Sequence, residues 1–123
     1  MSSNPIGWFE IYVDDMTRAK RFYETVFGTR LQKLESAGLE LWAFPMTQDK
    51  YGAAGALVKM DGFPAGNNSV LVYFSCVDCA VEAGRVTAAG GRIQRDKMSI
   101  GEYGYIALAF DSEGNMFGLH SRA

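Results

Sequence analysis

Residues 13–28 read VDDMTRAKRFYETVFG, and this stretch decides the fold of the chain. It begins at the end of IGWFEIYV, residues 6–13, whose alternation of apolar and polar-tipped side chains is typical of a half-buried strand. Asp14 and Asp15 are candidate N-caps, and Phe22 and Val26 recur at helical spacing before Gly28, a typical C-terminal stop. The stretch therefore predicts a strand followed directly by a helix.

The same order of elements is predicted a second time along the chain. Three strands are expected after the first helix, near 29–35, 39–45 and 53–60. The turn-rich joint DGFPAGNN, 61–68, separates them from a new strand, SVLVYFSC, at 69–76. A helix capped by Asp78 is expected to run to about Ala89, followed by strands near 92–98, 103–110 and 114–121.

The two halves also match each other in sequence. Val13-Asp14-Asp15 aligns with Cys76-Val77-Asp78, and GLELWAF at 38–44 aligns with GYIALAF at 104–110. The turn glycines Gly52 and Gly114 then correspond. Halves of roughly 60 residues are too small to bury both faces of a four-stranded sheet, so we expect them to pack together or onto another copy.

Bulk composition excludes several classes of protein. The chain has 123 residues, 48% of them hydrophobic and 21% charged, which predicts one globular domain spanning residues 1–123. A net charge of −2 argues against nucleic acid as a partner. No apolar run is long enough to span a membrane, and the first residues lack the features of a signal peptide. Two cysteines fit a reducing compartment, so a cytoplasmic location is expected.

Three stretches together carry a family resemblance: VDDMTRAKRFYETVFG, VTAAGGRI at 86–93 and FDSEGNMFGL at 110–119. In order and spacing the chain resembles the vicinal oxygen chelate superfamily of glyoxalase I, bleomycin-resistance proteins and extradiol dioxygenases. The resemblance implies an α+β fold of two βαβββ modules, about 6–60 and 69–123. Their curved mixed sheets would enclose a cleft, with the helices outside.

The resemblance also indicates where a metal would bind. In metal-dependent members, each module gives one ligand from its first strand and one from its last. Carried onto this chain, these positions hold no ordinary metal donor: they are Trp8, Ala56, Leu71 and Gly118. We therefore expect no metal and no other cofactor.

A register shift of two residues leaves one alternative for a metal. It would bring Glu10 and His120 to the ligand positions, with Tyr73 and Val58 as poor partners. Two donors fall short of the three protein ligands that catalytic sites usually provide.

Alternation places Trp8, Glu10 and Tyr12 on one face of the first strand, which would give a wall of amphipathic rings with one charge. Glu10 would position or deprotonate a ligand there, or its carboxylate would simply reach solvent or an arginine at the rim of the cleft. His120, the only histidine, is a bystander at the rim or a polar or proton-transfer group facing Glu10. The predicted ligand-binding residues are Trp8, Glu10, Tyr12, Trp42, Tyr73, Ser75, Tyr105, Met116 and His120, and only Glu10 and His120 are candidates for catalysis.

Cys76 and Cys79 form a C-x-x-C at a junction of strand and helix, where redox motifs occur. In the internal alignment, however, they match Val13 and Met16, which are packing positions. Free cysteine behaves as a small hydrophobe when buried, so packing is the favoured interpretation.

The favoured function is a metal-independent protein that binds or sequesters a small molecule, similar to the bleomycin-resistance branch. The alternative is a glyoxalase-type lyase or isomerase that uses Glu10 with His120 or a noncanonical divalent metal. A redox protein is the third hypothesis. A homodimer is expected, without nucleic acid or membrane partners. The ligand, the occurrence of catalysis, and whether the cleft lies within one chain or across a dimer stay open.

Overall fold

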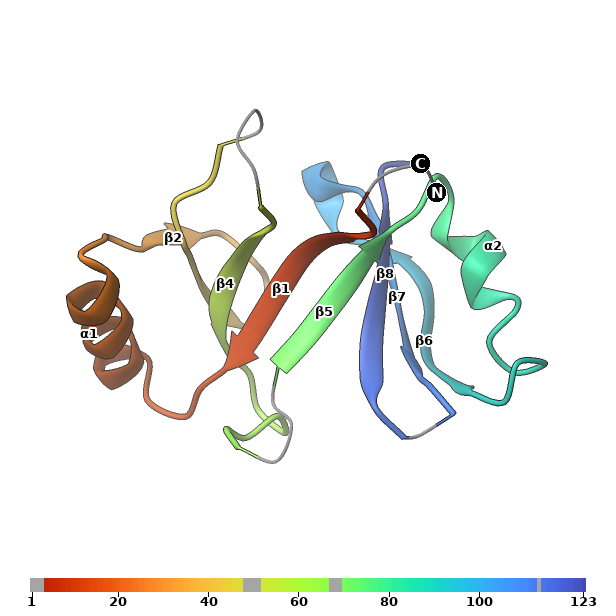
Figure 1. Cartoon of the computed structure of the whole chain (residues 1–123), viewed down its shortest axis with the longest axis horizontal. Coiled ribbons are helices and arrows are strands. Elements are labelled where there is room, and N and C mark those ends of the chain that lie inside the picture. The colour runs from red at the N-terminus through yellow and green to blue at the C-terminus, as the bar shows by residue number, and fades with distance from the viewer. Residues whose placement is uncertain (1–3, 48–51, 67–69, 113) are drawn as a thin grey trace. The chain divides into compact units, whose positions relative to one another are not determined.

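The computed structural model describes residues 4–47, 52–66, 70–112 and 114–123. Their elements, in chain order, are β1 (Ile6–Tyr12), α1 (Met16–Phe27), β2 (Gln32–Leu34), β3 (Glu40–Ala43), β4 (Ala54–Lys59), β5 (Val70–Ser75), α2 (Cys79–Ala83), β6 (Arg92–Ser99), the 3-10 turn Gly101–Tyr103, β7 (Tyr105–Phe110) and β8 (Met116–Ser121) (Figure 1). They form two compact units. The α1 unit is Phe9–Val70, and the α2 unit is Leu71–Ala123 together with the residues up to Trp8.

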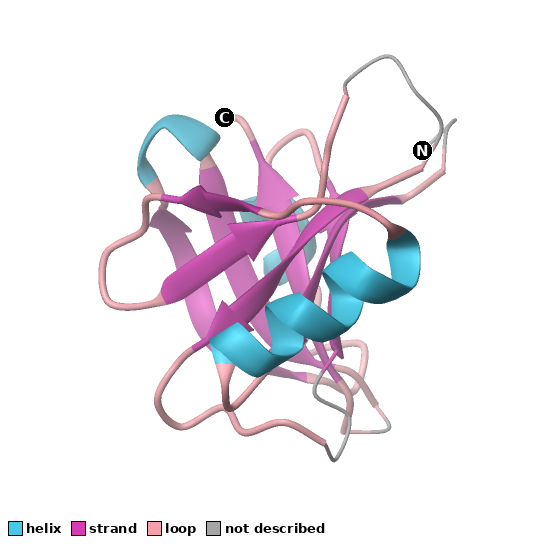
Figure 2. Ribbon diagram, turned by 90° about the vertical axis from the view of Figure 1, so that its left-hand side faces the viewer, coloured by secondary structure: helices cyan, strands magenta, loops and turns pink. Residues whose placement is uncertain are grey.

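In the α1 unit, the strands follow the order β2-β3-β4-β1. β3 pairs antiparallel with both β2 and β4, with Trp42 opposite Leu57 and Ala43 opposite Ala56. Helix α1 covers one face of this sheet, as Figure 2 shows. Between helix and sheet lies a core of buried apolar side chains: Val13, Met16, Leu31 and Leu57.

The predicted caps of α1 are confirmed. The Asp15 side chain accepts a hydrogen bond from the Arg18 backbone N–H at 3.0 Å, which satisfies a donor that the first turn leaves unpaired. Gly28 ends the helix with φ 61°, a left-handed conformation in which a Cβ is unfavourable. Its N–H donates back to the Glu24 carbonyl, so the chain reverses tightly there.

In the α2 unit, the strands follow the order β5-β8-β7-β6. β5 and β8 are parallel, whereas β8–β7 and β7–β6 are antiparallel. Ser75 N–H donates to the Pro5 carbonyl at 2.9 Å, which joins the residues before β1 to this unit. Helix α2 packs on one sheet face through Cys79, Ala83, Ala107 and Leu119.

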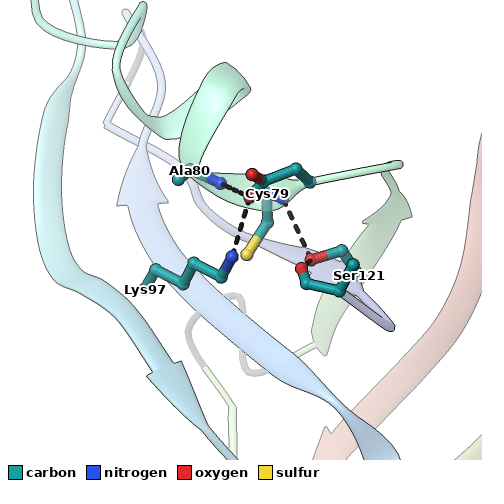
Figure 3. A network of polar contacts seen from close by, with 6 residues as sticks. Cys79, Ala80, Lys97 and Ser121 are labelled. Carbon is teal, nitrogen blue, oxygen red and sulfur yellow. Dashed lines mark hydrogen bonds and ion pairs between the residues drawn. The ribbon is translucent and has the colours of Figure 1, made fainter.

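A polar network fixes the start of α2 (Figure 3). Asp78 caps the Ala80 N–H at 3.0 Å and forms an ion pair with Lys97 Nζ at 2.8 Å. The buried Ser121 hydroxyl accepts the Cys79 N–H at 3.0 Å and donates to the Ala123 carbonyl at 2.9 Å. The last strand and the helix are therefore joined through a single side chain.

The fold class is confirmed: the chain is α+β, and each half repeats the βαβββ order. The second helix is shorter than expected. It ends at Ala83 instead of Ala89, because irregular turns follow Gly84, with several hydrogen bonds reaching only three residues back. The single-domain boundary and the enclosed cleft stay predictions.

The alignment of 38–44 with 104–110 is wrong by one residue. Gly52 and Gly114 both have positive φ and lie four residues before Ala56 and Gly118. Ala56 pairs with Ala43, and Gly118 pairs with Leu108. Ala43 therefore corresponds to Leu108. The sequence alignment instead matches Leu108 with Trp42.

Candidate functional site

The face of each sheet opposite its helix is the predicted ligand face, and the packing defines it. In the α1 unit, Ile11 and Val13 contact the α1 core, so alternation along β1 turns Glu10 and Tyr12 to the opposite face. In the α2 unit, Phe74, Cys76 and Leu119 lie on the helix side. Tyr73, Ser75, Met116, Gly118 and His120 alternate with those residues and lie on the other side.

Glu10 and Tyr12 form the best-defined polar group on the predicted ligand face of the α1 unit. The Tyr12 hydroxyl donates to Glu10 Oε1 at 2.6 Å, a short hydrogen bond of the kind that a charged acceptor forms. The Tyr12 ring is only 9% exposed, and Glu10 is half-buried. The structure thus holds a carboxylate at a fixed position beside an aromatic surface.

Phe63 completes this group and was not predicted. Its ring stacks on Tyr12 with centroids 5.4 Å apart and an angle of 27° between the planes. Two backbone contacts hold its loop: Phe63 N–H donates to the Met60 carbonyl, and Ala65 N–H donates to Asp14 Oδ1 at 3.0 Å. The glycine- and proline-rich sequence of the loop predicts only a joint between the two halves. Its single aromatic residue was the available signal.

In the α2 unit, Tyr73 lies over the backbone of Gly118. The two residues are partners in the parallel β5–β8 pair, and a Cβ on Gly118 would overlap the Tyr73 ring. Tyr73 is buried. The ring therefore occupies the space into which a side chain at residue 118 would project.

Ser75 and His120 are also register partners on this face. The Ser75 Oγ lies against the backbone of Gly7, where a Cβ would overlap it. His120 Nε2 lies 2.7 Å from the Tyr103 carbonyl, an acceptor, so Nε2 carries the hydrogen and donates it. That nitrogen cannot act as a base in this arrangement, and a proton-transfer role would fall to Nδ1.

Met116 and Trp8 belong to the α2 unit as well, and both are half-buried. Met116 pairs with Phe110, so these two apolar side chains extend the face at the far end of β8 from His120. Trp8, Tyr73, Ser75, Met116 and His120 thus lie in one unit, whereas Glu10 and Tyr12 lie in the other.

Two predicted ligand-binding residues lie on the helix side of their sheets instead of the predicted ligand face. Trp42 packs against the α1 core, and Lys20 Nζ lies 3.3 Å from its ring centroid. Tyr105 packs against the α2 core, and Lys97 Nζ lies 4.7 Å from the centroid of its ring. The register pairs explain the error, because Trp42 is opposite the core residue Leu57 and Tyr105 is opposite Ser121, which binds the start of α2.

The residues at the metal positions that the family resemblance implies do not fit a metal. Trp8, Ala56, Leu71 and Gly118 offer no side-chain donor that a divalent cation favours, and Tyr73 covers the last of them. In the shifted register, Glu10 Oε1 accepts from Tyr12 and His120 Nε2 is directed at a carbonyl. Within the described ranges, no three His, Cys, Asp or Glu side chains gather closely enough to hold a metal.

The cysteines pack as the internal repeat predicted. Cys79 is fully buried in the α2 core, Cys76 packs against that core, and both are free thiols. Burial raises the pKa of the Cys76 thiol to about 11, with the nearby Glu82 carboxylate acting in the same direction. A thiol with such a pKa is protonated at neutral pH, which is unfavourable for redox chemistry.

Two βαβββ modules, each with a ring-lined face opposite its helix, define the class of protein to which this chain is comparable. The family model described as Glyoxalase/Bleomycin resistance protein/Dioxygenase superfamily matches residues 5–119. The chain belongs to this superfamily, which confirms the resemblance found in its sequence.

Among curated proteins, the chain is 28% identical over 110 residues to "Putative glyoxylase CFP32" of Mycobacterium bovis and of Mycobacterium tuberculosis. The match covers 89% of this chain but 41% of those proteins, so the chain spans less than half the length of these relatives.

Two solved structures share the fold. Methylmalonyl-CoA epimerase of Streptomyces coelicolor, in complex with 2-nitronate-propionyl-CoA, is 19% identical with a TM-score of 0.69, and the match covers 99% of each chain. The epimerase of Mycobacterium tuberculosis is 15% identical with a TM-score of 0.68, covering 97% of this chain and 88% of that one. At such identities the likeness shows the fold alone.

Neither helix in the described ranges has the length and apolar character that a membrane crossing requires.

Proposed function

We propose that this chain binds small organic molecules without a metal, on the face of each unit's sheet opposite its helix. The observation that carries the proposal is the Tyr73 ring over Gly118, at a position where metal-dependent members place a ligand. The Tyr73 ring occupies the space where a metal-ligating side chain at residue 118 would project. Tyr73 itself is only 6% exposed, so a ligand with a flat apolar surface would contact the half-buried Met116 on the same face.

The Glu10–Tyr12–Phe63 group supplies the polar selectivity of the α1 unit's face. A carboxylate fixed by the Tyr12 hydroxyl at 2.6 Å favours a ligand that carries an N–H donor or a positive charge. The half-buried Phe63 ring, stacked on the buried Tyr12 ring, offers apolar contact beside it. An aromatic cation combines both features.

The superfamily's description includes bleomycin-resistance proteins, and structural neighbours hold acyl-CoA ligands. Both facts support a small molecule as the partner. The finer properties of the proposal are sequestration without turnover, a cytoplasmic location and a homodimer. Light scattering coupled to gel filtration tests the last, and a monomeric mass at micromolar concentration contradicts it.

Ligand binding is tested by calorimetry and thermal shift with metal-free bleomycin and smaller aromatic cations, in buffer containing EDTA. A ligand present at about a hundred times its Kd should stabilise the protein by about 2.7 kcal/mol. Glu10→Gln should weaken binding of a cation about tenfold. Glu35→Gln removes the same charge from an exposed residue of the same unit and should leave affinity unchanged.

The glyoxalase-type alternative predicts a different outcome. Protein purified without chelators would then contain stoichiometric metal that is lost in Glu10→Gln, and it would convert the hemithioacetal of methylglyoxal and glutathione. Either result contradicts the proposal of a metal-independent binding protein.

A further inference from the structure

A groove of about 540 Å³ lies along α1 and the turn that follows it, in the α1 unit. Its lining is polar, with three cations, three threonines and one carboxylate: Lys20, Arg21, Arg30, Thr17, Thr25, Thr29 and Glu24. The predicted ligand faces do not include these residues. The groove is therefore a second candidate site, independent of the proposed function.

Local structure explains how the groove forms. Thr17, Lys20, Arg21, Glu24 and Thr25 are three or four residues apart and line one side of the helix. Gly28, with φ 61°, then reverses the chain.

The reversed segment is held along the helix by two bonds. Thr29 N–H donates to the Glu24 carbonyl at 3.2 Å, and Leu31 N–H donates to Glu24 Oε2 at 2.9 Å. Arg30 thereby lines the same groove as Arg21.

The charges of the groove are unbalanced. Three cations, Lys20, Arg21 and Arg30, face one carboxylate, Glu24, and that carboxylate already accepts the Leu31 N–H. Lys20 is partly engaged by the Trp42 ring. Arg21 and Arg30 are exposed and form no ion pair with any residue in the described part of the chain. Two arginines are thus available to an anion from solution.

We propose that this groove binds a phosphate-bearing small molecule, with Arg21 and Arg30 as its charged contacts. The planar guanidinium groups match the oxygen geometry of phosphate. The hydroxyls of Thr17, Thr25 and Thr29 line the same groove and provide neutral donors. A volume of about 540 Å³ lies within the range of ligand sites, so the groove is large enough for more than a single inorganic ion.

The experiment is calorimetric titration of the whole chain with inorganic pyrophosphate, at two salt concentrations. We expect saturable binding that weakens as salt rises. The double variant Arg21→Gln with Arg30→Gln should lose about tenfold in affinity. The control, Arg85→Gln with Arg122→Gln, removes two exposed arginines of the α2 unit and should bind as the parent does. Thermal unfolding of all three proteins checks that each is folded.

Three outcomes would overturn the proposal: no saturable binding of pyrophosphate, equal affinity in the groove variant and the parent, or equal losses in the groove variant and the control. A further arm uses phosphatidylcholine vesicles with and without phosphatidylglycerol. Binding to the anionic vesicles without binding of free pyrophosphate would assign the cations to a lipid headgroup and overturn the claim for a soluble ligand. Failure of the proposed metal-independent binding at Glu10 would leave this test unaffected.

Discussion

The ring of Tyr73 covers the backbone of Gly118 on the neighbouring parallel strand, and a Cβ on Gly118 would overlap that ring. The family resemblance implies that residue 118 is the position at which metal-dependent members carry a ligand on their last strand. The Tyr73 ring can occupy this position because residue 118 has no side chain. A ligand cannot be restored there by a single substitution without displacing Tyr73.

Gly118→Ala should lower the free energy of unfolding by about 1–3 kcal/mol, because the added methyl group has no room beside the buried ring. Urea titration measures the change. Gly84→Ala is the matched control, since Gly84 has a right-handed helical backbone with φ −66°. Its change should stay within about 1 kcal/mol. Equal costs for the two variants would show that Tyr73 does not restrict residue 118.

The elements of the fold were predictable because their signals are local. Asp15 and Gly28 mark the ends of α1, and both caps were legible in the sequence. The sequence did not predict which side chains of β3 and β7 face the helices. The match of GLELWAF with GYIALAF rests on identical residues, whereas the register of the strands depends on which side chains are buried. Trp42 was predicted as a further wall of the ligand face, but its ring packs with Leu57 on the α1 side.

Tyr12→Phe removes the hydroxyl that donates to Glu10 but keeps the ring that stacks on Phe63. We expect a loss of about 1–3 kcal/mol in the free energy of unfolding, because the half-buried carboxylate loses a hydrogen bond. Calorimetry on the same variant should show weaker binding of an aromatic cation. Tyr103→Phe, at an exposed ring in the α2 unit, should change neither quantity. Unchanged stability of Tyr12→Phe would mean that the hydrogen bond contributes nothing.

Ser121→Ala should destabilise the α2 unit by about 1–3 kcal/mol. Ser121 is 1% exposed, and its hydroxyl is the acceptor for the Cys79 N–H at the start of α2. Hydrogen exchange should then show faster opening of α2 than in the parent protein. Ser36→Ala, at an exposed position, should leave both exchange and stability within about 0.5 kcal/mol. Unaltered exchange at Cys79 would contradict the role assigned to this hydroxyl.

Cys76 should make the protein less stable in alkali. Burial raises its pKa to about 11 in the folded chain, from an ordinary value of 9.0. Above the lower value the unfolded state loses its proton first, so the stability that the neutral thiol supports is present below pH 9.0 and falls as the pH rises to about 11. The free energy of unfolding of the parent minus that of Cys76→Ala should therefore decrease as the pH rises across that range. Urea titrations of both proteins measure it. Parallel curves would show that the thiol does not contribute.

The candidate site was only partly visible in the sequence. Alternation was enough to place Glu10 with Tyr12 and Tyr73 with Ser75, because period two is a property of any strand. Phe63 was missed because a ring in a glycine- and proline-rich loop has no periodicity, and its position depends on Ala65 binding Asp14 across the chain. Contacts of this kind arise from tertiary structure alone.

The two units differ in how much of the chain each must gather. Phe9–Val70 is one continuous segment, so its strands and helix can assemble while the ribosome is still adding later residues. The α2 unit joins Pro5 to Ser75 and β5 to β8, which is synthesised some forty residues later. During translation, β5 is therefore made before its partner strand β8, and Tyr73 is then exposed. A chaperone could bind that apolar surface in this interval.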